Sequence, residues 1–260
     1  MKSERLEVKP DTVFSYYLRE GVKPVTLVFI HGLGDRKETH LKAADYPELS
    51  DYGLLIVDQI GYGDSSHPDG FTYSMRSQAE ALKKLIDKLG ISDVVLMPHS
   101  MGGPVAVELA EMLGTRVKGI VYAEGNVDFG DCFFSNWIIT KYTYDQWVNE
   151  AFPKLLERYK NDSAQVKYAV SFGKAGAVST YRSSEDLVAV SKKDDIVERL
   201  VTLMVPILAV FGEKNRGRFA SEKKLGEVFP LVFIPNAAHS MMVDNPDAFY
   251  HEVSAFLKKV

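Results

Sequence analysis

Seven residues at positions 97–103, MPHSMGG, carry the strongest structural signal in this chain. They join a short apolar run to a segment of helical period, so Ser100 stands at a strand-to-helix joint. Such a sharp turn strains the serine backbone and pushes its hydroxyl out of the sheet. The glycines let the helix pack close to the strand, and the amide of Met101 lies at the positive end of that helix. The pattern predicts an exposed nucleophile; the alternative is an ordinary N-cap serine.

Apolar, β-branched runs alternate with helical patterns on both sides of this stretch. The runs that we interpret as buried strands are 25–30, 54–57, 94–97, 117–123, 207–211 and 231–234. Apolar spacings of three and four indicate helices at 79–89, 105–113 and 249–257. Asn245 and Pro246 form a start signal for the last helix, and segments 5–8 and 12–18 resemble an edge hairpin. This alternation predicts an α/β fold with a mostly parallel, doubly wound sheet.

Residues 127–195 interrupt the alternation. The stretch has no obvious core strand and many aromatic residues, and a structureless loop of that length is uncommon in a compact domain. We therefore expect a mostly helical insertion that caps one end of the sheet, with 1–126 and 196–260 forming the core. The alternative is an ordinary helical segment packed on the side of the core.

The composition argues against several classes of protein. The 260 residues carry a net charge of −4 without a long basic block, so neither nucleic acid nor an anionic membrane is an expected partner. The start, MKSERLEV, lacks the apolar stretch of a signal peptide, and the apolar runs are far shorter than the ~20 residues of a membrane helix. The single cysteine, Cys132, allows no intrachain disulfide. We expect a cytoplasmic protein with a small-molecule substrate, no metal and no cofactor.

Three segments resemble landmarks of the α/β-hydrolase family, and the resemblance extends over nearly the whole chain. MPHSMGG matches the family's Gly-x-Ser-x-Gly pattern, except that Pro98 replaces the first glycine. The turn HGLG, which contains Leu33, follows the first buried run, as does the family turn that supplies an oxyanion amide. DQIGYGDS at 58–65 resembles a family loop that braces the nucleophile region. The resemblance implies an α/β-hydrolase fold with a helical cap, Ser100 as nucleophile, and the amides of Leu33 and Met101 as oxyanion hole.

His239 stands where family members carry their catalytic base. It follows the last buried run, in PNAAHS, and a neutral imidazole there would take the serine proton and return it to the leaving group. The acid is harder to assign, because the family's Gly-x-x-Asp pattern reads GEKN, with Asn215 in place of aspartate. Asparagine cannot stabilise an imidazolium, and in serine proteases the Asp→Asn change costs about 10⁴ in kcat. We expect His31 and His99 to be structural and His40, His67 and His251 to lie on the surface.

Glu124 is the strongest candidate for the acid. It directly follows the run 117–123, and some α/β-hydrolases, including one group of haloalkane dehalogenases, carry their acid after this strand. A glutamate at the end of a buried strand would otherwise be a desolvated charge without evident purpose. The remaining candidates for orienting the histidine are Asn215, Glu213, Asp128 and Asp131.

A serine nucleophile narrows the chemistry to acyl transfer. Serine forms acyl-enzymes, whereas epoxide hydrolases and dehalogenases of this fold use a carboxylate nucleophile. We expect a serine carboxylic ester hydrolase with a small apolar or aromatic substrate, which the aromatic insertion would help to bind. Two alternatives stay open. One is a C–C bond hydrolase, which needs polar groups for a substrate carboxylate; the other is a non-catalytic, receptor-like member that binds a small ligand.

Overall fold

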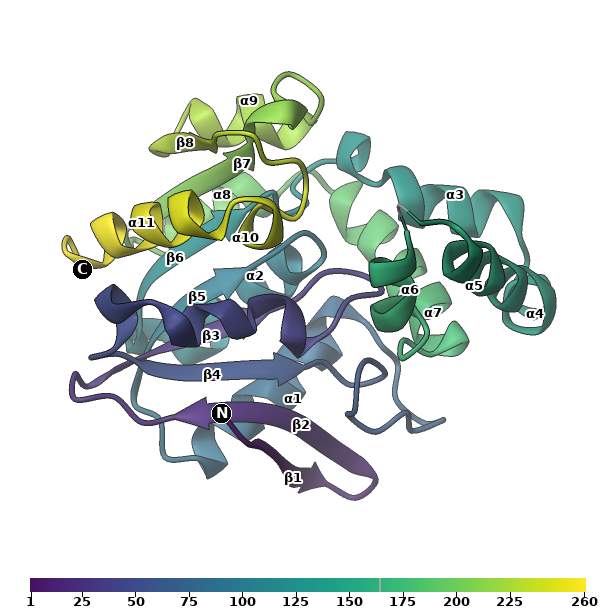
Figure 1. Ribbon diagram of the computed structural model, residues 1–260, viewed down its shortest axis with the longest axis horizontal. Coiled ribbons are helices and arrows are strands. Elements are labelled where there is room, and N and C mark those ends of the chain that lie inside the picture. Colours follow the sequence, from purple (N-terminus) through teal and green to yellow (C-terminus); the bar gives the residue numbers. More distant parts are fainter. Residues whose placement is uncertain (164) are drawn as a thin grey trace.

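One eight-stranded sheet, in the order β1-β2-β4-β3-β5-β6-β7-β8, forms the centre of the computed structural model, which describes residues 1–163 and 165–260. The strands are β1 (Ser3–Lys9), β2 (Thr12–Arg19), β3 (Val25–Ile30), β4 (Gly53–Asp58), β5 (Asp93–Pro98), β6 (Val117–Ala123), β7 (Ile207–Gly212) and β8 (Leu231–Ile234). The β1–β2 hairpin and the β2–β4 pair are antiparallel, and every other pair is parallel (Figure 1). The predicted edge hairpin and doubly wound α/β sheet are confirmed.

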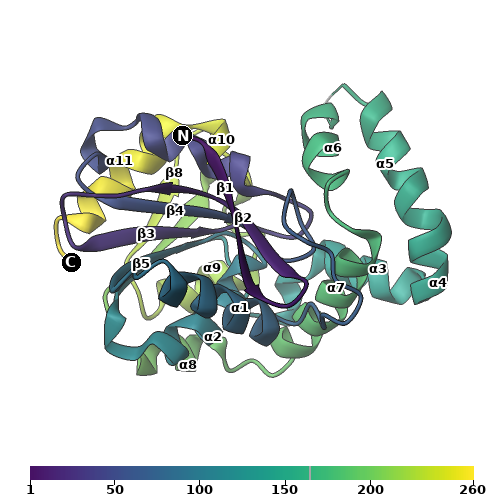
Figure 2. The same ribbon diagram turned by 90° about the horizontal axis from the view of Figure 1, so that it is seen from below.

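Both faces of the sheet are apolar because helices cover both. In β3, Val28 and Ile30 pack into one buried cluster, and Leu27 and Phe29 pack into the other, since successive side chains of a strand point to opposite faces. The first cluster includes residues of α1 (Met75–Lys88), α2 (Gly102–Leu113), α8 (Ile196–Thr202) and α9 (Ala220–Gly226). The second includes residues of η1 (Lys37–Asp45), η2 (Pro47–Leu49), α10 (Met241–Asp244) and α11 (Pro246–Leu257). Figure 2 shows α1, α2 and α8 on one face and α10 and α11 on the other.

The start signal of the last helix acts as expected. The Asn245 side chain accepts a hydrogen bond from the Ala248 amide at 3.3 Å, and Pro246 is the first residue of α11. Proline suits this position because its missing amide hydrogen would have had no helical partner there. Nδ2 of Asn245 also donates to the Pro235 carbonyl at 2.8 Å, which connects the start of α11 to the loop that carries His239.

Residues 127–195 are helical wherever they contain regular structure in the described part of the chain. The elements are η4 (Phe129–Asp131), α3 (Phe133–Lys141), α4 (Tyr144–Gln146), η5 (Trp147–Ala151), α5 (Phe152–Asn161), α6 (Val166–Phe172) and α7 (Ala177–Ser191). A separate apolar cluster joins α3, η5, α5, α6 and α7. It includes Trp147, whose indole donates to the Ala177 carbonyl and the Thr180 hydroxyl, both at 3.1 Å. Figures 1 and 2 show α4, α5 and α6 standing beyond the edge of the sheet. Much of the aromatic content therefore forms the segment's own core.

No helix in the described part of the chain combines the length and apolar character needed to cross a bilayer.

Candidate active site

Five consecutive parallel strands deliver the candidate residues to one edge of the sheet. Pairing in register places Ile30 beside Pro98, and Gly212 beside Ile234. The carboxyl ends of parallel strands meet at one edge, where open α/β sheets bind their ligands. The residues that follow these ends are Leu33 after β3, Ser100 after β5, Glu124 after β6, Asn215 after β7 and His239 after β8.

Ser100 occupies a strained turn between β5 and α2. Its φ is 54°, a left-handed conformation that is unfavourable for residues other than glycine, and its amide donates to the Ala123 carbonyl at 3.1 Å. A Cβ on Gly102 would lie 2.3 Å from the Ile30 carbonyl oxygen, and one on Gly103 would lie 2.4 Å from the Tyr122 hydroxyl. Close packing of α2 against the sheet thus requires both glycines. Proline at 98 is compatible with the turn because it extends β5.

His239 contacts a carboxylate through one ring nitrogen. Its Nδ1 lies 2.6 Å from Oε2 of Glu124. A carboxylate can only accept, so Nδ1 carries the proton and Nε2 is left as the basic nitrogen of the neutral ring. The Glu124 side chain is fully buried, whereas 42% of the His239 side chain is exposed. The buried partner therefore fixes the tautomer while the imidazole stays accessible from the cavity described below.

Two donors from the end of β7 hold the Glu124 carboxylate. The Gly212 amide donates to Oε1 at 2.7 Å, and Nδ2 of Asn215 lies 3.1 Å from Oε1 and 3.0 Å from Oε2. Asn215 therefore donates to the candidate acid, Glu124. It does not hydrogen-bond to the imidazole of His239, the role that we considered for it from the sequence. The other candidates have different partners: Glu213 accepts from the Asn236 amide, Asp128 pairs with Lys224, and Asp131 accepts from the Val127, Asp128 and Ser221 amides.

The turn after β3 lies against the serine. A Cβ on Gly32 would lie 3.0 Å from the Ser100 Cβ and 3.5 Å from its Oγ. Among the described residues, neither the Leu33 amide nor the Met101 amide has an acceptor within the protein. Two unpaired amides close to a hydroxyl are the arrangement needed to bind a developing oxyanion. Tyr168 of α6 donates to the Leu33 carbonyl at 3.2 Å, which ties the helical segment to this turn.

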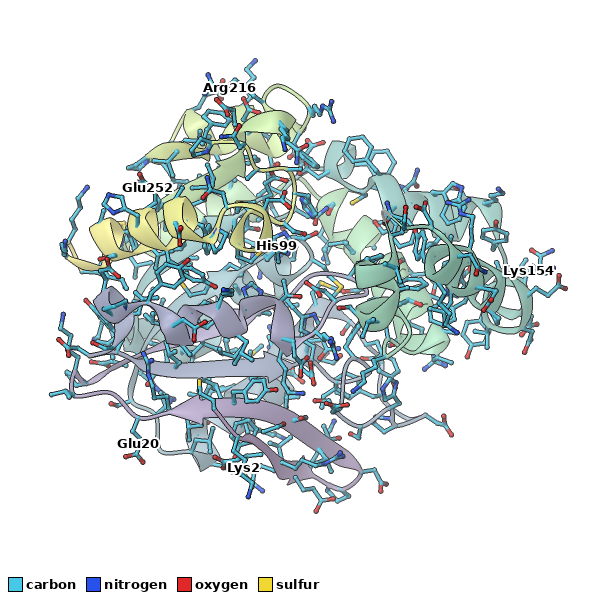
Figure 3. All side chains as sticks on the ribbon, viewed as in Figure 1. Lys2, Glu20, His99, Lys154, Arg216 and Glu252 are labelled. Carbon is cyan, nitrogen blue, oxygen red and sulfur yellow. The ribbon has the colours of Figure 1, made fainter. Side chains whose placement is uncertain are left out.

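Two further histidines lie behind the serine. Nε2 of His99 donates to the His239 carbonyl at 2.9 Å, so His99 supports the histidine loop as well as the turn. Figure 3 labels His99 in the interior of the molecule. Burial, with smaller effects from His239 and His40, holds the pKa of His99 well below its usual range, and the ring stays neutral. The surface position expected for His40 is wrong: the residue is 2% exposed and packs against Phe29. Nothing in its local sequence marks it as buried, because its neighbours in η1 are mostly polar.

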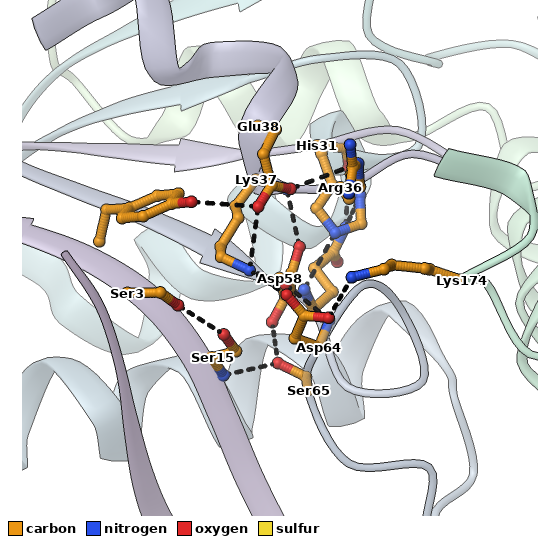
Figure 4. A network of polar contacts seen from close by, with 12 residues as sticks. Ser3, Ser15, His31, Arg36, Lys37, Glu38, Asp58, Asp64, Ser65 and Lys174 are labelled. Atoms are coloured by element: carbon orange, nitrogen blue, oxygen red, sulfur yellow. Dashed lines mark hydrogen bonds and ion pairs between the residues drawn. The ribbon is translucent and has the colours of Figure 1, made fainter. Parts of the chain in front are cut away.

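A buried ion-pair network braces the loops beneath the site (Figure 4). Nζ of Lys37 lies 2.7 Å from Asp58 and 2.9 Å from Asp64, and Asp58 also accepts from the Lys37 and Asp64 amides. Burial alone would lower the pKa of Lys37, but hydrogen bonds to Asp58 and Asp64 and the charges of Asp58 and Glu38 raise it above its usual range. Lys174, which precedes α7, reaches Asp64 at 2.5 Å. This network could not be predicted from the sequence, because a lysine in a polar stretch resembles a surface residue.

Replacing Lys37 by methionine is expected to lower the free energy of unfolding by about 3–5 kcal/mol, because the fully buried Asp58 would lose the charge that it faces. Lys174→Met is the matched control. It removes an ion pair whose side chains are 42% and 41% exposed, so it should cost under about 1 kcal/mol. Urea unfolding followed by circular dichroism measures both. Equal losses would show that the buried pair does not anchor these loops.

A cavity of about 680 Å³ opens above Ser100 and His239. One part of its wall is aromatic and comes from the helical segment and the α9 region: Phe133, Phe134, Tyr159, Tyr168 and Phe219. The charged residues on its wall are mostly acidic: Asp35, Glu38, Glu124, Asp131 and Asp244, with Arg36 as the one guanidinium among the described lining residues. Nε of Arg36 already lies 3.3 Å from Glu38. The cavity thus combines apolar surface with net negative charge.

Comparisons with known proteins agree with this architecture. Residues 25–209 match the family described as alpha/beta hydrolase fold, and the chain belongs to the α/β-hydrolase family. Lipase 3 of Moraxella sp. is 33% identical over 121 residues, which are 44% of this chain and 38% of that lipase. A putative esterase/lipase of Haemophilus influenzae is 22% identical over 258 residues, 94% of this chain and 87% of that protein. The solved structure of a carboxylesterase from Nitrososphaera gargenis has a TM-score of 0.78 at 16% identity and covers 98% of both chains.

Proposed function

We propose that the protein is a serine hydrolase of carboxylic esters, with Ser100 as nucleophile, His239 as base and Glu124 as the acid. The observation that carries the proposal is the 2.6 Å contact between Glu124 and Nδ1 of His239, at the cavity that Ser100 also lines. Glu124 thus provides the carboxylate that family members carry at the position of Asn215. The names of the relatives, a lipase and a putative esterase/lipase, are consistent with ester hydrolysis.

The chemistry follows from these positions. Nε2 of His239 takes the proton of the Ser100 hydroxyl as its oxygen attacks the ester carbonyl, and the Leu33 and Met101 amides bind the oxyanion. The imidazolium is stabilised by Glu124 and returns the proton to the departing alcohol, which leaves an acyl-serine. Water then attacks the acyl-serine, with His239 acting as base a second time, and the carboxylic acid is released. No cofactor is needed for these steps.

We further propose that residues 127–195 act as a cap over this cavity. The aromatic side chains of α3, α5 and α6 line its wall, and Tyr168 and Lys174 connect the segment to the loops after β3 and β4. Apolar surface of this kind stabilises a bound acyl or aryl group by about 25 cal/mol per Å² buried. The cap would therefore contribute to substrate binding, whereas the core carries out the chemistry.

The charge of the cavity favours uncharged acyl groups over anionic ones. Asp35, Asp131 and Asp244 have no cationic side chain within 4.0 Å in the described part of the chain, and Arg36 is shared with Glu38. Two like charges 8 Å apart repel by about 2 kcal/mol at an effective dielectric of 20. A C–C bond hydrolase of the kind considered above would need to bind a substrate carboxylate in this cavity. The negative charge of the cavity wall therefore favours ester hydrolysis over C–C bond hydrolysis of a substrate that carries a carboxylate.

A pair of activated esters of equal length tests this proposal. At pH 8, p-nitrophenyl valerate is expected to be hydrolysed, with kcat/KM at least ten times that of mono-p-nitrophenyl glutarate. A repulsion of about 2 kcal/mol exceeds the roughly 1.4 kcal/mol that changes a rate tenfold. Raising the salt concentration should narrow the ratio, since salt screens exposed charges. Faster hydrolysis of the glutarate would contradict the charge argument. Hydrolysis of neither ester, together with tight binding of a small ligand, would favour the receptor-like alternative.

A further inference from the structure

We infer that Asn215 is a positioning residue that holds Glu124 in place for His239, an inference that rests on the proposed function. The family pattern places an aspartate at this position, and this chain places the carboxylate at the end of β6 and an amide at the end of β7. The two groups face each other across neighbouring parallel strands. The asparagine is therefore the partner that an acid at 124 requires, and not a lost catalytic group.

The contacts of Asn215 show how it acts. Its Nδ2 lies within hydrogen-bonding distance of both Glu124 oxygens, at 3.1 and 3.0 Å, and the residue is 7% exposed. Its own carbonyl accepts from the Arg218 amide at 2.9 Å, and the Lys214 amide donates to the Ala237 carbonyl at 2.9 Å. The side chain thus projects from a backbone that is fixed on both sides. An amide is neutral at every accessible pH, so it donates to the carboxylate without competing for a proton.

Glu124 needs such a partner because of its own geometry. Its φ is 40°, in the left-handed region, so the backbone stores strain at this position. Its carboxylate is fully buried, and burial of an unpaired charge is costly. Gly212, Asn215 and His239 together supply the donors that satisfy it. Removing the amide of Asn215 would free the carboxylate to rotate away from the imidazole.

An aspartate at 215 would create the opposite situation. Its carboxylate would face that of Glu124 at about the 3.0 Å now spanned by the amide, and two carboxylates so close cannot both ionise. One of them would keep a proton, as in paired catalytic carboxylates. The acid at 124 and the asparagine at 215 are therefore linked, and changing either one alone should impair the site.

A set of four variants tests this inference with p-nitrophenyl valerate as substrate. Asn215→Ala is expected to lower kcat by about 100-fold with KM within twofold, because small misplacements of catalytic groups have effects of this size. Glu124→Gln/Asn215→Asp, which exchanges the acid and the amide, should be at least ten times more active than Glu124→Gln alone. Asn136→Ala, which removes an amide from α3, is the control and should match the wild type.

The outcomes separate this inference from the proposed function. Wild-type protein that neither hydrolyses esters nor reacts with a fluorophosphonate would contradict the proposed function itself. An active wild type with an equally active Asn215→Ala would refute the positioning role. If Asn215→Ala does not fold, as judged by circular dichroism, the positioning role is tested with the exchange variant, Glu124→Gln/Asn215→Asp. Rescue by the exchange is compared with that of a fifth variant, Glu124→Ala/Asn215→Asp, because an aspartate at the family's acid position could contact His239 without help from an amide at 124. A higher kcat for the exchange variant than for this fifth variant supports the inference. Equal kcat values, or no rescue in folded variants, overturn it.

Discussion

Ser100→Ala is expected to lower kcat for p-nitrophenyl valerate by about 10⁶-fold, the loss seen when the nucleophile of a serine-hydrolase triad is removed. The hydroxyl is the atom that forms the acyl-enzyme, and no neighbouring group on the strained turn can take its place. The residual rate would come from the oxyanion amides and the cavity, which alanine leaves intact. The measurement is steady-state release of p-nitrophenol.

A fluorophosphonate probe provides a second reading of the same variant. The wild type should be labelled at one site and Ser100→Ala should not. Ser254→Ala is a suitable control, because Ser254 is also buried but lies in α11, away from the cavity. Labelling of Ser100→Ala at the wild-type rate, or full esterase activity in this variant, would exclude Ser100 as the nucleophile.

The second large effect concerns Glu124. Glu124→Gln is expected to lower kcat by about 10⁴-fold, by analogy with the serine-protease triad. Glutamine cannot stabilise an imidazolium. The Gly212 amide and Nδ2 of Asn215 both donate to the carboxylate of Glu124, and the NH2 group of glutamine cannot accept a hydrogen bond from either of them. The tautomer of His239 would then no longer be fixed with Nδ1 protonated. Comparison of the pH profiles of kcat/KM would show the loss at every pH at which the wild type is active.

Glu213→Gln is the matched control for this change. Glu213 directly follows β7, and its carboxylate accepts from the Asn236 amide at 3.0 Å, an interaction that glutamine can retain through its carbonyl oxygen. We expect kcat to change less than tenfold. The assignment of the acid would be wrong if Glu213→Gln were the more damaging variant, or if Asn215→Ala reduced kcat more than Glu124→Gln.

Local sequence patterns were sufficient for the elements that carry the site. The run 117–123 was expected as a strand and forms β6, and the proline-led start of α11 lies where its signal indicated. These features depend on neighbouring residues, because side-chain periodicity, caps and tight turns are determined within a few positions of the chain. The burial of His40 and Lys37 could not be predicted from local patterns, because the residues that cover them are distant in sequence.

By itself the sequence determined the alternating strands and helices, the serine at the turn after β5 and the histidine after the last strand, since each depends on residues adjacent in the chain. Only the tertiary structure decided which carboxylate meets His239 and where the amide of Asn215 points. Those contacts join residues 115 and 91 positions apart, and their distances depend on the register and twist of β6, β7 and β8. The net negative charge of the cavity was decided in the same way, because its carboxylates come from five separate loops and elements that meet only in the folded chain.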